Sequence, residues 1–249
     1  VRARYTKYEY RIPMRDGVRL FTAVYVPKDA GGSKRYPILL NRTPYSVAPY
    51  GSGSVRESLG PSDVAAKEGY IFAYQDVRGR YMSEGRFEDV RPYNPTKGPG
   101  ETDESSDTWD TIEWLLKKLP WGNGRVGMWG ISYPGFYASM GTIDAHPALV
   151  ATSPQAPIAD WFIGDDFHHN GASFLPHACN FLSSFGKPRP EPTTKGEARF
   201  DHKTQDGYRF FLDAGPMPSY DRKYLKGEVA FWKEILSHDT YDAFWQARN

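Results

Sequence analysis

The segment Gly130-Ile131-Ser132-Tyr133-Pro134-Gly135 constrains the fold more than any other part of this sequence. It follows a short, mainly apolar run at 125–129 and precedes a stretch that can form a helix. A sharp turn between a strand and a helix lifts the serine hydroxyl clear of its neighbours, and small flanking residues let the two elements approach closely. The start of the helix favours a developing negative charge. We therefore interpret Ser132 as a nucleophile; the alternative is an incidental serine in a buried turn.

Further motifs accompany this turn. The usual pattern has glycine two residues after the serine, whereas here Pro134 holds that place and Gly135 follows. The other motifs are Met14-Arg15-Asp16-Gly17-Val18-Arg19-Leu20, Arg42-Thr43-Pro44-Tyr45, Asp76-Val77-Arg78-Gly79-Arg80 with Ser83-Glu84-Gly85, and the segment 156–171. Together they resemble the α-amino-acid ester hydrolases, cocaine-esterase-like enzymes and X-Pro dipeptidyl peptidases, a superfamily of α/β-hydrolases. The segment 156–171 is most similar to the α-amino-acid ester hydrolases.

The resemblance implies an oxyanion hole with two donors. The backbone N–H of Tyr133, directly after the serine, is the standard first donor in this fold. The resemblance assigns the second donor to the phenol of Tyr45, in the Arg-Thr-Pro-Tyr motif. A phenol with a reference pKa of about 10 donates as a neutral group at pH 7. The alternative is that Tyr45 is a packing residue at the end of a strand.

A pair of acidic residues, Asp165 and Asp166, indicates the substrate class. Adjacent carboxylates can hold an ammonium group through charge-assisted hydrogen bonds. By resemblance, Asp166 corresponds to an aspartate that binds the amino group of an α-amino acyl substrate; a solvated helix cap is the alternative. We thus expect a serine hydrolase or acyltransferase that acts on α-amino-acid esters and β-lactam side-chain amides through an acyl-enzyme. Another esterase or X-Pro dipeptidyl peptidase of the same superfamily, or an inactive N-terminal fragment, remains the alternative.

The rest of the catalytic triad is not recognisable. In this fold the chain order is Ser, then Asp or Glu, then His. Six histidines follow Ser132, and none comes after an apolar strand with an acidic partner on an earlier strand end. Members of the superfamily are considerably longer, with more sheet after the cap and a β jelly-roll domain. We therefore expect the triad Asp and His to be absent from this chain, which would be the N-terminal portion of a larger enzyme.

Composition excludes several other classes of protein. The 31 basic and 30 acidic residues give a net charge of +1, and no basic block suggests nucleic acid. The single cysteine, Cys179, excludes an intrachain disulfide and a multi-cysteine metal site. We expect no metal and no cofactor, because His168-His169 lacks a third ligand and no phosphate-binding or dinucleotide motif is present. No apolar run is long enough for a membrane span. The resemblance implies a periplasmic or secreted enzyme whose leader is not in this chain, and a homo-oligomer.

Hydrophobic periodicity predicts an α/β sandwich with a mostly parallel sheet. A strong hairpin signal at Asp16-Gly17 joins the first two expected strands, and Asp107 is the expected cap of a helix that Pro120 ends. Residues 1–155 are expected to form the N-terminal part of the hydrolase core, and 156–249 a helical cap interrupted by a proline-rich linker at 186–195. Strands are expected at 8–13, 18–26, 38–41, 70–75, 126–130 and 149–152, and helices at 62–68, 108–119, 135–145, near 206–212 and within 220–245.

Overall fold

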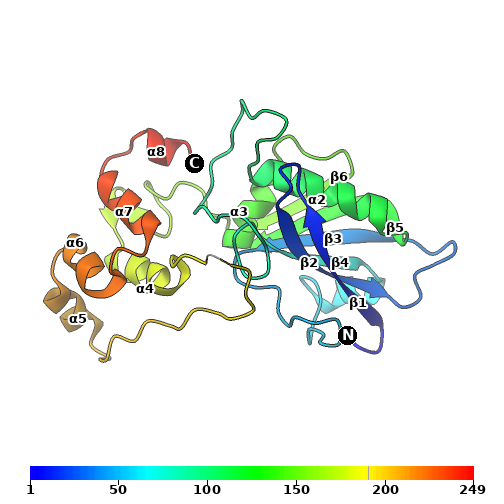
Figure 1. Cartoon of the computed structure of the whole chain (residues 1–249), viewed down its shortest axis with the longest axis horizontal. Coiled ribbons are helices and arrows are strands. Elements are labelled where there is room, and N and C mark those ends of the chain that lie inside the picture. Colours follow the sequence, from blue (N-terminus) through cyan, green and yellow to red (C-terminus); the bar gives the residue numbers. More distant parts are fainter. Residues whose placement is uncertain (190) are drawn as a thin grey trace. The chain divides into compact units, whose positions relative to one another are not determined.

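The computed structural model describes residues 1–189 and 191–249, and the chain divides into two compact units (Figure 1). The first unit contains Val1–Pro157 and a short segment that ends at Thr194. The second contains Ile158–Arg189 and Lys195–Asn249. Pro190, which belongs to the predicted linker, lies outside the described residues. The assignment of 1–155 and 156–249 as core and cap stays a prediction.

A six-stranded mixed sheet forms the first unit, as the sequence predicts. Its strands are β1 (Tyr5–Pro13), β2 (Arg19–Pro27), β3 (Tyr36–Thr43), β4 (Ile71–Asp76), β5 (Gly122–Ile131) and β6 (Leu149–Gln155), in the order β1-β2-β4-β3-β5-β6. The β1–β2 hairpin is antiparallel, and β3 to β6 are parallel to one another. Gly17 takes a φ of +86° in the predicted hairpin turn, where glycine meets no steric penalty. The carboxyl ends of the parallel strands meet at one edge of the sheet.

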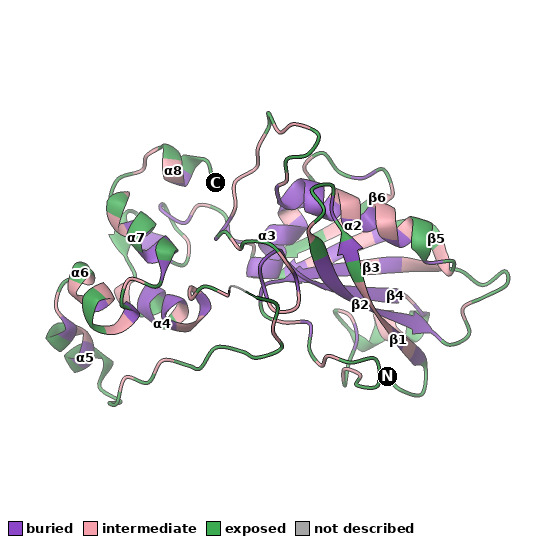
Figure 2. Cartoon of the chain, viewed as in Figure 1, coloured by how far each residue is buried: buried purple, intermediate pink, exposed green. Residues whose placement is uncertain are grey.

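Helices cover both faces of this sheet (Figure 2). The helices α2 (Glu104–Lys118) and α3 (Tyr133–Met140) contact one face, on which Gln75 of β4 donates to Thr111 of α2 at 2.9 Å. On the other face, α1 (Asp63–Glu68) packs Ala65 and Ala66 against a buried cluster that includes Phe21 and Phe72. Alternate side chains of the central strands therefore face the two sides of the sheet.

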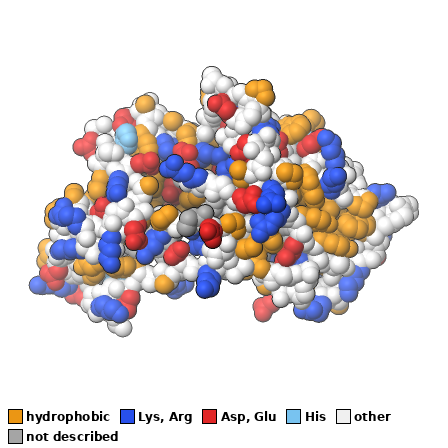
Figure 3. All heavy atoms as spheres, viewed as in Figure 1, with side chains coloured by type: hydrophobic (Ala, Val, Ile, Leu, Met, Phe, Trp, Pro, Cys, Tyr) orange, Lys and Arg blue, Asp and Glu red, His pale blue; other side chains and the backbone are white. Residues whose placement is uncertain are grey.

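An aromatic row fixes α2 and the start of β5 against the edge strand β1. The Tyr8 and Trp121 rings stack with centroids 5.2 Å apart, and Tyr10 lies 5.0 Å from Trp114. These side chains are only partly buried. Figure 3 shows hydrophobic side chains gathered on the surface of the first unit.

Two predicted helix starts are wrong. The helix α2 begins at Glu104, because Asp103 and Ser106 form a reciprocal capping box with two 2.8 Å hydrogen bonds. The predicted cap, Asp107, instead lies inside α2 and is fully buried in ion pairs. The helix ends at Lys118, before Pro120 as predicted. The helix α3 spans Tyr133–Met140, whereas a helix at 135–145 was expected.

The second unit is mainly helical. Its helices are α4 (Leu175–Phe185), α5 (Gly207–Ala214), α6 (Met217–Tyr220), the π-helix η1 (Asp221–Leu225), α7 (Ala230–Ser237) and α8 (Ala243–Gln246), with the two-residue strands β7 (His168–His169) and β8 (Ala172–Ser173). The predicted helical stretch at 220–245 is broken, because Lys226 and Gly227 take positive φ values of 54° and 71°. The helix α4 was not predicted. Within the described residues, no helix combines the length and apolar character that a bilayer span requires.

Candidate active site

Ser132 occupies a strained turn between β5 and α3. Its φ of 61° and ψ of −125° place a non-glycine residue in a sparsely populated region. The turn is held on both sides, since the Ser132 N–H donates to Gln155 O of β6 at 3.0 Å and its carbonyl accepts from Phe136 N at 3.0 Å. Backbone strain of this kind costs on the order of 1–3 kcal/mol and clusters at active sites.

Two glycines make this turn possible. A Cβ on Gly130 would lie 2.1 Å from the Pro134 carbonyl oxygen, and one on Gly135 would lie 2.7 Å from Gln155 O. Neither backbone position can accept a side chain without movement. The second required glycine stands three residues after Ser132, one position later than in the usual pattern. The predicted close approach of strand and helix is confirmed.

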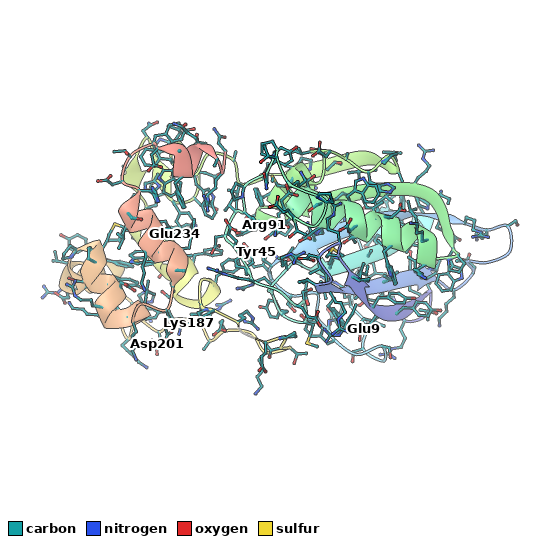
Figure 4. All side chains as sticks on the ribbon, turned by 45° about the horizontal axis from the view of Figure 1, so that its top comes forward. Glu9, Tyr45, Arg91, Lys187, Asp201 and Glu234 are labelled. Atoms are coloured by element: carbon teal, nitrogen blue, oxygen red, sulfur yellow. The ribbon has the colours of Figure 1, made fainter. Side chains whose placement is uncertain are left out.

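The Ser132 and Tyr45 side chains extend from the same edge of the sheet. Ser132 follows β5, Tyr45 follows β3, and these two strands are parallel neighbours. Tyr45, labelled in Figure 4, is 43% exposed, and its ring lies perpendicular to that of Tyr133 with centroids 6.2 Å apart. The Ser132 hydroxyl does not cap α3, and it makes no hydrogen bond to any part of the chain that the structure describes.

Hydrogen bonds and ring stacking hold the Tyr133 side chain in place. Its buried phenol accepts from Val90 N at 2.7 Å and donates to Asp89 Oδ1 at 3.2 Å. Its ring stacks on Tyr137 with centroids 5.3 Å apart. Burial raises the pKa of the Tyr133 phenol well above its usual value, so the group stays neutral. The same residue contributes the first backbone N–H of α3, at the positive end of the helix dipole.

A buried ion-pair network lies beneath this turn, on the α2 face of the sheet. Asp107 Oδ1 lies 2.7 Å from Arg78 Nη2, and Arg78 Nη1 lies 2.7 Å from Asp16 Oδ2. Arg42, fully buried on β3, pairs with Glu104 at 3.0 Å. Its guanidinium also lies 5.6 Å from the centroid of the Tyr137 ring. The network therefore joins the hairpin turn, β3 and α2 to the aromatic layer under Ser132.

Arginines of the segment that follows β4 bind carboxylates and a backbone carbonyl of other segments. Arg78 links Asp16 to α2, and Arg80 Nε donates to the Pro44 carbonyl at 3.1 Å. Arg91, labelled in Figure 4, joins the same network through Asp107 at 3.0 Å. These bonds restrain the loops that follow β3 and β4.

Asp165 and Asp166 belong to the second unit and differ in environment. The Asp165 carboxylate accepts from Ala159 N at 2.7 Å and from Asp166 N at 2.8 Å, so it holds its own loop. The Asp166 side chain is 48% exposed and lies 4.0 Å from His177 Nε2. Burial, followed by the neighbouring Asp165 charge, raises the pKa of Asp166. Among the described residues, backbone N–H groups donate to the Asp165 carboxylate and not to that of Asp166.

The histidines that follow Ser132 have local partners. His146 Nε2 lies 3.0 Å from Glu113, and His238 Nδ1 lies 2.6 Å from Asp242. His168 is buried with its Nδ1 3.2 Å from the Trp161 carbonyl. No group of three potential metal-binding side chains occurs in residues 1–189 and 191–249.

Two buried carboxylates near the site were not recognised from the sequence. Asp89 anchors the Tyr133 phenol from a loop with no strand or helix pattern, so no local signal marks it. Asp76 belongs to the motif at 76–80, but the sequence does not reveal its partners. It accepts hydrogen bonds from Val47, Tyr50 and Met82, which only the fold brings close to it.

Comparison with known proteins identifies a matching family and several similar proteins. The model of the X-Pro dipeptidyl-peptidase (S15) family matches residues 16–249. The cocaine esterase of Rhodococcus sp. (strain MB1 Bresler) is 33% identical over 247 residues, which cover 95% of this chain and 39% of the esterase. A putative serine esterase of Mycobacterium bovis is 29% identical over 254 residues, covering 92% of this chain and 38% of that protein.

Solved structures share the fold over nearly the whole chain. A selenomethionine-labelled α-amino acid ester hydrolase matches with a TM-score of 0.83 at 38% identity, covering 98% of this chain and 39% of that protein. An aminopeptidase from a marine sediment archaeon, Thaumarchaeota archaeon, matches with a TM-score of 0.84 at 37% identity, covering 98% of this chain and 40% of that one. The chain thus spans about two fifths of the length of these relatives, and the predicted α/β-hydrolase fold is confirmed. It belongs to the X-Pro dipeptidyl-peptidase (S15) family.

Proposed function

We propose that the complete protein is a serine hydrolase that transfers an acyl group from an ester or amide to water or an amine. The observation that carries this proposal is the strained Ser132 turn, at the same sheet edge as Tyr45. The Ser132 oxygen attacks the substrate carbonyl, the leaving group departs, and a nucleophile then releases the acyl-enzyme. The hydroxyl proton passes to a histidine base, which we expect outside these 249 residues.

The oxyanion would be stabilised by two neutral donors. The Tyr133 N–H begins α3, and the perpendicular Tyr45 ring supplies a phenol from the adjacent strand end. Donors that are fixed before the reaction do not have to reorganise in the transition state. The Asp89 and Val90 contacts of the Tyr133 phenol, and the Arg80 bond to Pro44, supply that rigidity.

The preferred acyl group carries a free α-amino group, and β-lactam side-chain amides belong to the same class. Asp166 would bind the ammonium, because its carboxylate is half exposed, unlike that of Asp165. The second candidate is an esterase or dipeptidyl peptidase without this selectivity; the 33% identity to a cocaine esterase favours it. A periplasmic or secreted location and a homo-oligomer stay predictions.

Covalent labelling tests the nucleophile. The complete protein would be treated with a serine-directed fluorophosphonate, and the adduct mapped by mass spectrometry. We expect a single adduct on Ser132, lost in Ser132→Ala. The matched control is Ser139→Ala on the same helix α3, which should label normally. An adduct elsewhere, or labelling that survives Ser132→Ala, would contradict the proposal.

A further inference from the structure

Asp76 is a buried carboxylate that the proposed chemistry does not use. It is the last residue of β4, is 0% exposed, and pairs in register with Thr43 at the end of β3. Asp76 therefore lies beside the strand end that precedes Tyr45. Burial raises the pKa of Asp76 to about 7, although the Tyr50 phenol, the N–H groups of Met82 and Val47, and nearby Arg80 favour its charged form.

The hydrogen bonds of Asp76 converge on the segment that follows Tyr45. Its Oδ1 accepts from Val47 N at 2.9 Å, and its Oδ2 accepts from the Tyr50 phenol at 2.9 Å. Oδ2 also accepts from Met82 N at 3.2 Å. Two of the three donors therefore lie within five residues after Tyr45, and the third belongs to the neighbouring loop.

The turn at Tyr45 needs such restraint. Ser46 takes a φ of 91°, a conformation that is strained for a residue with a side chain. The chain is held before this turn by Thr43 Oγ1, which accepts from Tyr45 N at 3.1 Å, and by Arg80 at the Pro44 carbonyl. After the turn it is held by Asp76 at Val47, which is fully buried. Tyr45 itself stays 43% exposed between these anchors.

We propose that Asp76 is a positioning residue that fixes the Tyr45 phenol at the reacting carbonyl through its bonds to Val47 and Tyr50. This inference rests on the proposed role of Tyr45 as an oxyanion donor. Asp76 does not touch the substrate; it holds the strained turn that presents Tyr45. An error of about 1 Å in the placement of a catalytic group can cost on the order of a hundredfold in rate.

A double-mutant cycle in the complete protein tests the proposal. The variants are Asp76→Asn, Tyr45→Phe and their combination, assayed for kcat and KM on phenylglycine methyl ester. Asparagine keeps the shape of the side chain but cannot accept all three hydrogen bonds. We expect Asp76→Asn to lower kcat by at least about tenfold with KM little changed. In the Tyr45→Phe background the same change should lower kcat by less than about twofold, because the group being positioned is already lost.

Equal losses in both backgrounds would overturn the inference and make Asp76 a residue of the fold alone. An unchanged kcat in Asp76→Asn would also overturn it. If Tyr45→Phe itself leaves kcat unchanged, the proposed oxyanion role is wrong, and the assignment of Asp76 falls with it. The single Tyr45→Phe measurement therefore separates the two failures.

A milder variant covers the case in which Asp76→Asn does not fold. Tyr50→Phe removes one donor to Asp76 while keeping the ring that packs on Phe21 with centroids 5.4 Å apart. We expect a loss of kcat that disappears in the Tyr45→Phe background. The matched control is Tyr25→Phe, which removes another buried hydroxyl on the same sheet face and should leave kcat unchanged. A loss of kcat by Tyr50→Phe that persists without the Tyr45 hydroxyl would overturn the inference.

Discussion

Replacements of Ser132 should all remove activity but should differ in their effect on stability, because the backbone of this residue is strained. Its φ of 61° is strained for serine and available to glycine. We expect Ser132→Gly to be more stable than Ser132→Ala by about 1 kcal/mol, since relief of strain outweighs the greater entropy of glycine in the unfolded chain. Both variants should lose activity. The measurement is the free energy of unfolding in urea.

Ser139, the next-to-last residue of α3, is the matched control for this prediction. Glycine within a helix is less stable than alanine by up to roughly 1 kcal/mol. The order of the two replacements should therefore reverse between Ser132 and Ser139. If alanine were the more stable replacement at both positions, the turn at Ser132 would not be strained.

Asp166 carries a prediction about selectivity. If it binds the substrate ammonium, Asp166→Asn in the complete protein should lower kcat/KM for phenylglycine methyl ester by about thirtyfold or more, since removing one partner of a desolvated charge pair costs roughly 2–5 kcal/mol. Phenylacetic acid methyl ester, which lacks the amino group, should be hydrolysed nearly as fast as by the wild type. Equal losses on the two esters would make Asp166 structural and favour the cocaine-esterase-like alternative.

At the scale of elements, the contact between β5 and α3 depends on glycine. Gly130→Ala would place a methyl group 2.1 Å from the Pro134 carbonyl, so strand or helix must move. We expect a loss of stability of about 1–3 kcal/mol, as for other overpacked sites, together with a loss of fluorophosphonate labelling at Ser132. Gly53→Ala is the control, because no atom lies within 4 Å of that Cβ and its φ is not in the left-handed region. A Gly130→Ala protein with normal stability and labelling would show that the close approach is not needed.

The sequence predicted all six strands of the sheet, although β1 begins at Tyr5 rather than at residue 8 and β5 begins at Gly122 rather than at residue 126. Apolar runs mark β3, β4 and the second half of β5, because the buried positions of these strands are mostly filled by apolar residues. Asp103 and Asp107 are equally good cap residues by type. The choice between them depends on Ser106 nearby and on Arg78, which reaches Asp107 from another loop. The hydrophobic periodicity of the sequence does not reveal such long-range partners.

At the scale of the whole chain, short motifs identified the candidate catalytic residues. The fold showed which buried residues hold them in place. Ser132 and Tyr45 were singled out from short patterns, and the parallel strands β3 and β5 place the two residues at one edge of the sheet. Their catalytic roles stay predictions. Asp76 and Asp89 could not be assigned, because their partners, Val47 and Tyr133, come from segments 29 and 44 residues away. Support of this kind is a property of tertiary structure.

The buried ion-pair network around Asp107 should contribute to the stability of the first unit. Asp107 is fully buried and contacts Arg78, Arg91 and Arg42 from three different segments. Asp107→Ala would leave buried guanidinium groups with fewer counter-charges, and breaking a buried pair from one side costs about 3–5 kcal/mol. We expect a loss of that size in the free energy of unfolding of the complete protein in urea.

The matched control for Asp107→Ala is Glu113→Ala on the same helix. Glu113 is partly exposed on α2 and pairs with Lys117, which is exposed, and with His146, which is largely buried. Its removal should cost far less than the loss of Asp107, because exposed ion pairs are screened by water. Similar losses for the two variants would mean that helix propensity, rather than the buried charges, sets the contribution of α2. A large loss confined to Asp107→Ala would show that the segments below Ser132 depend on one carboxylate for their charge balance.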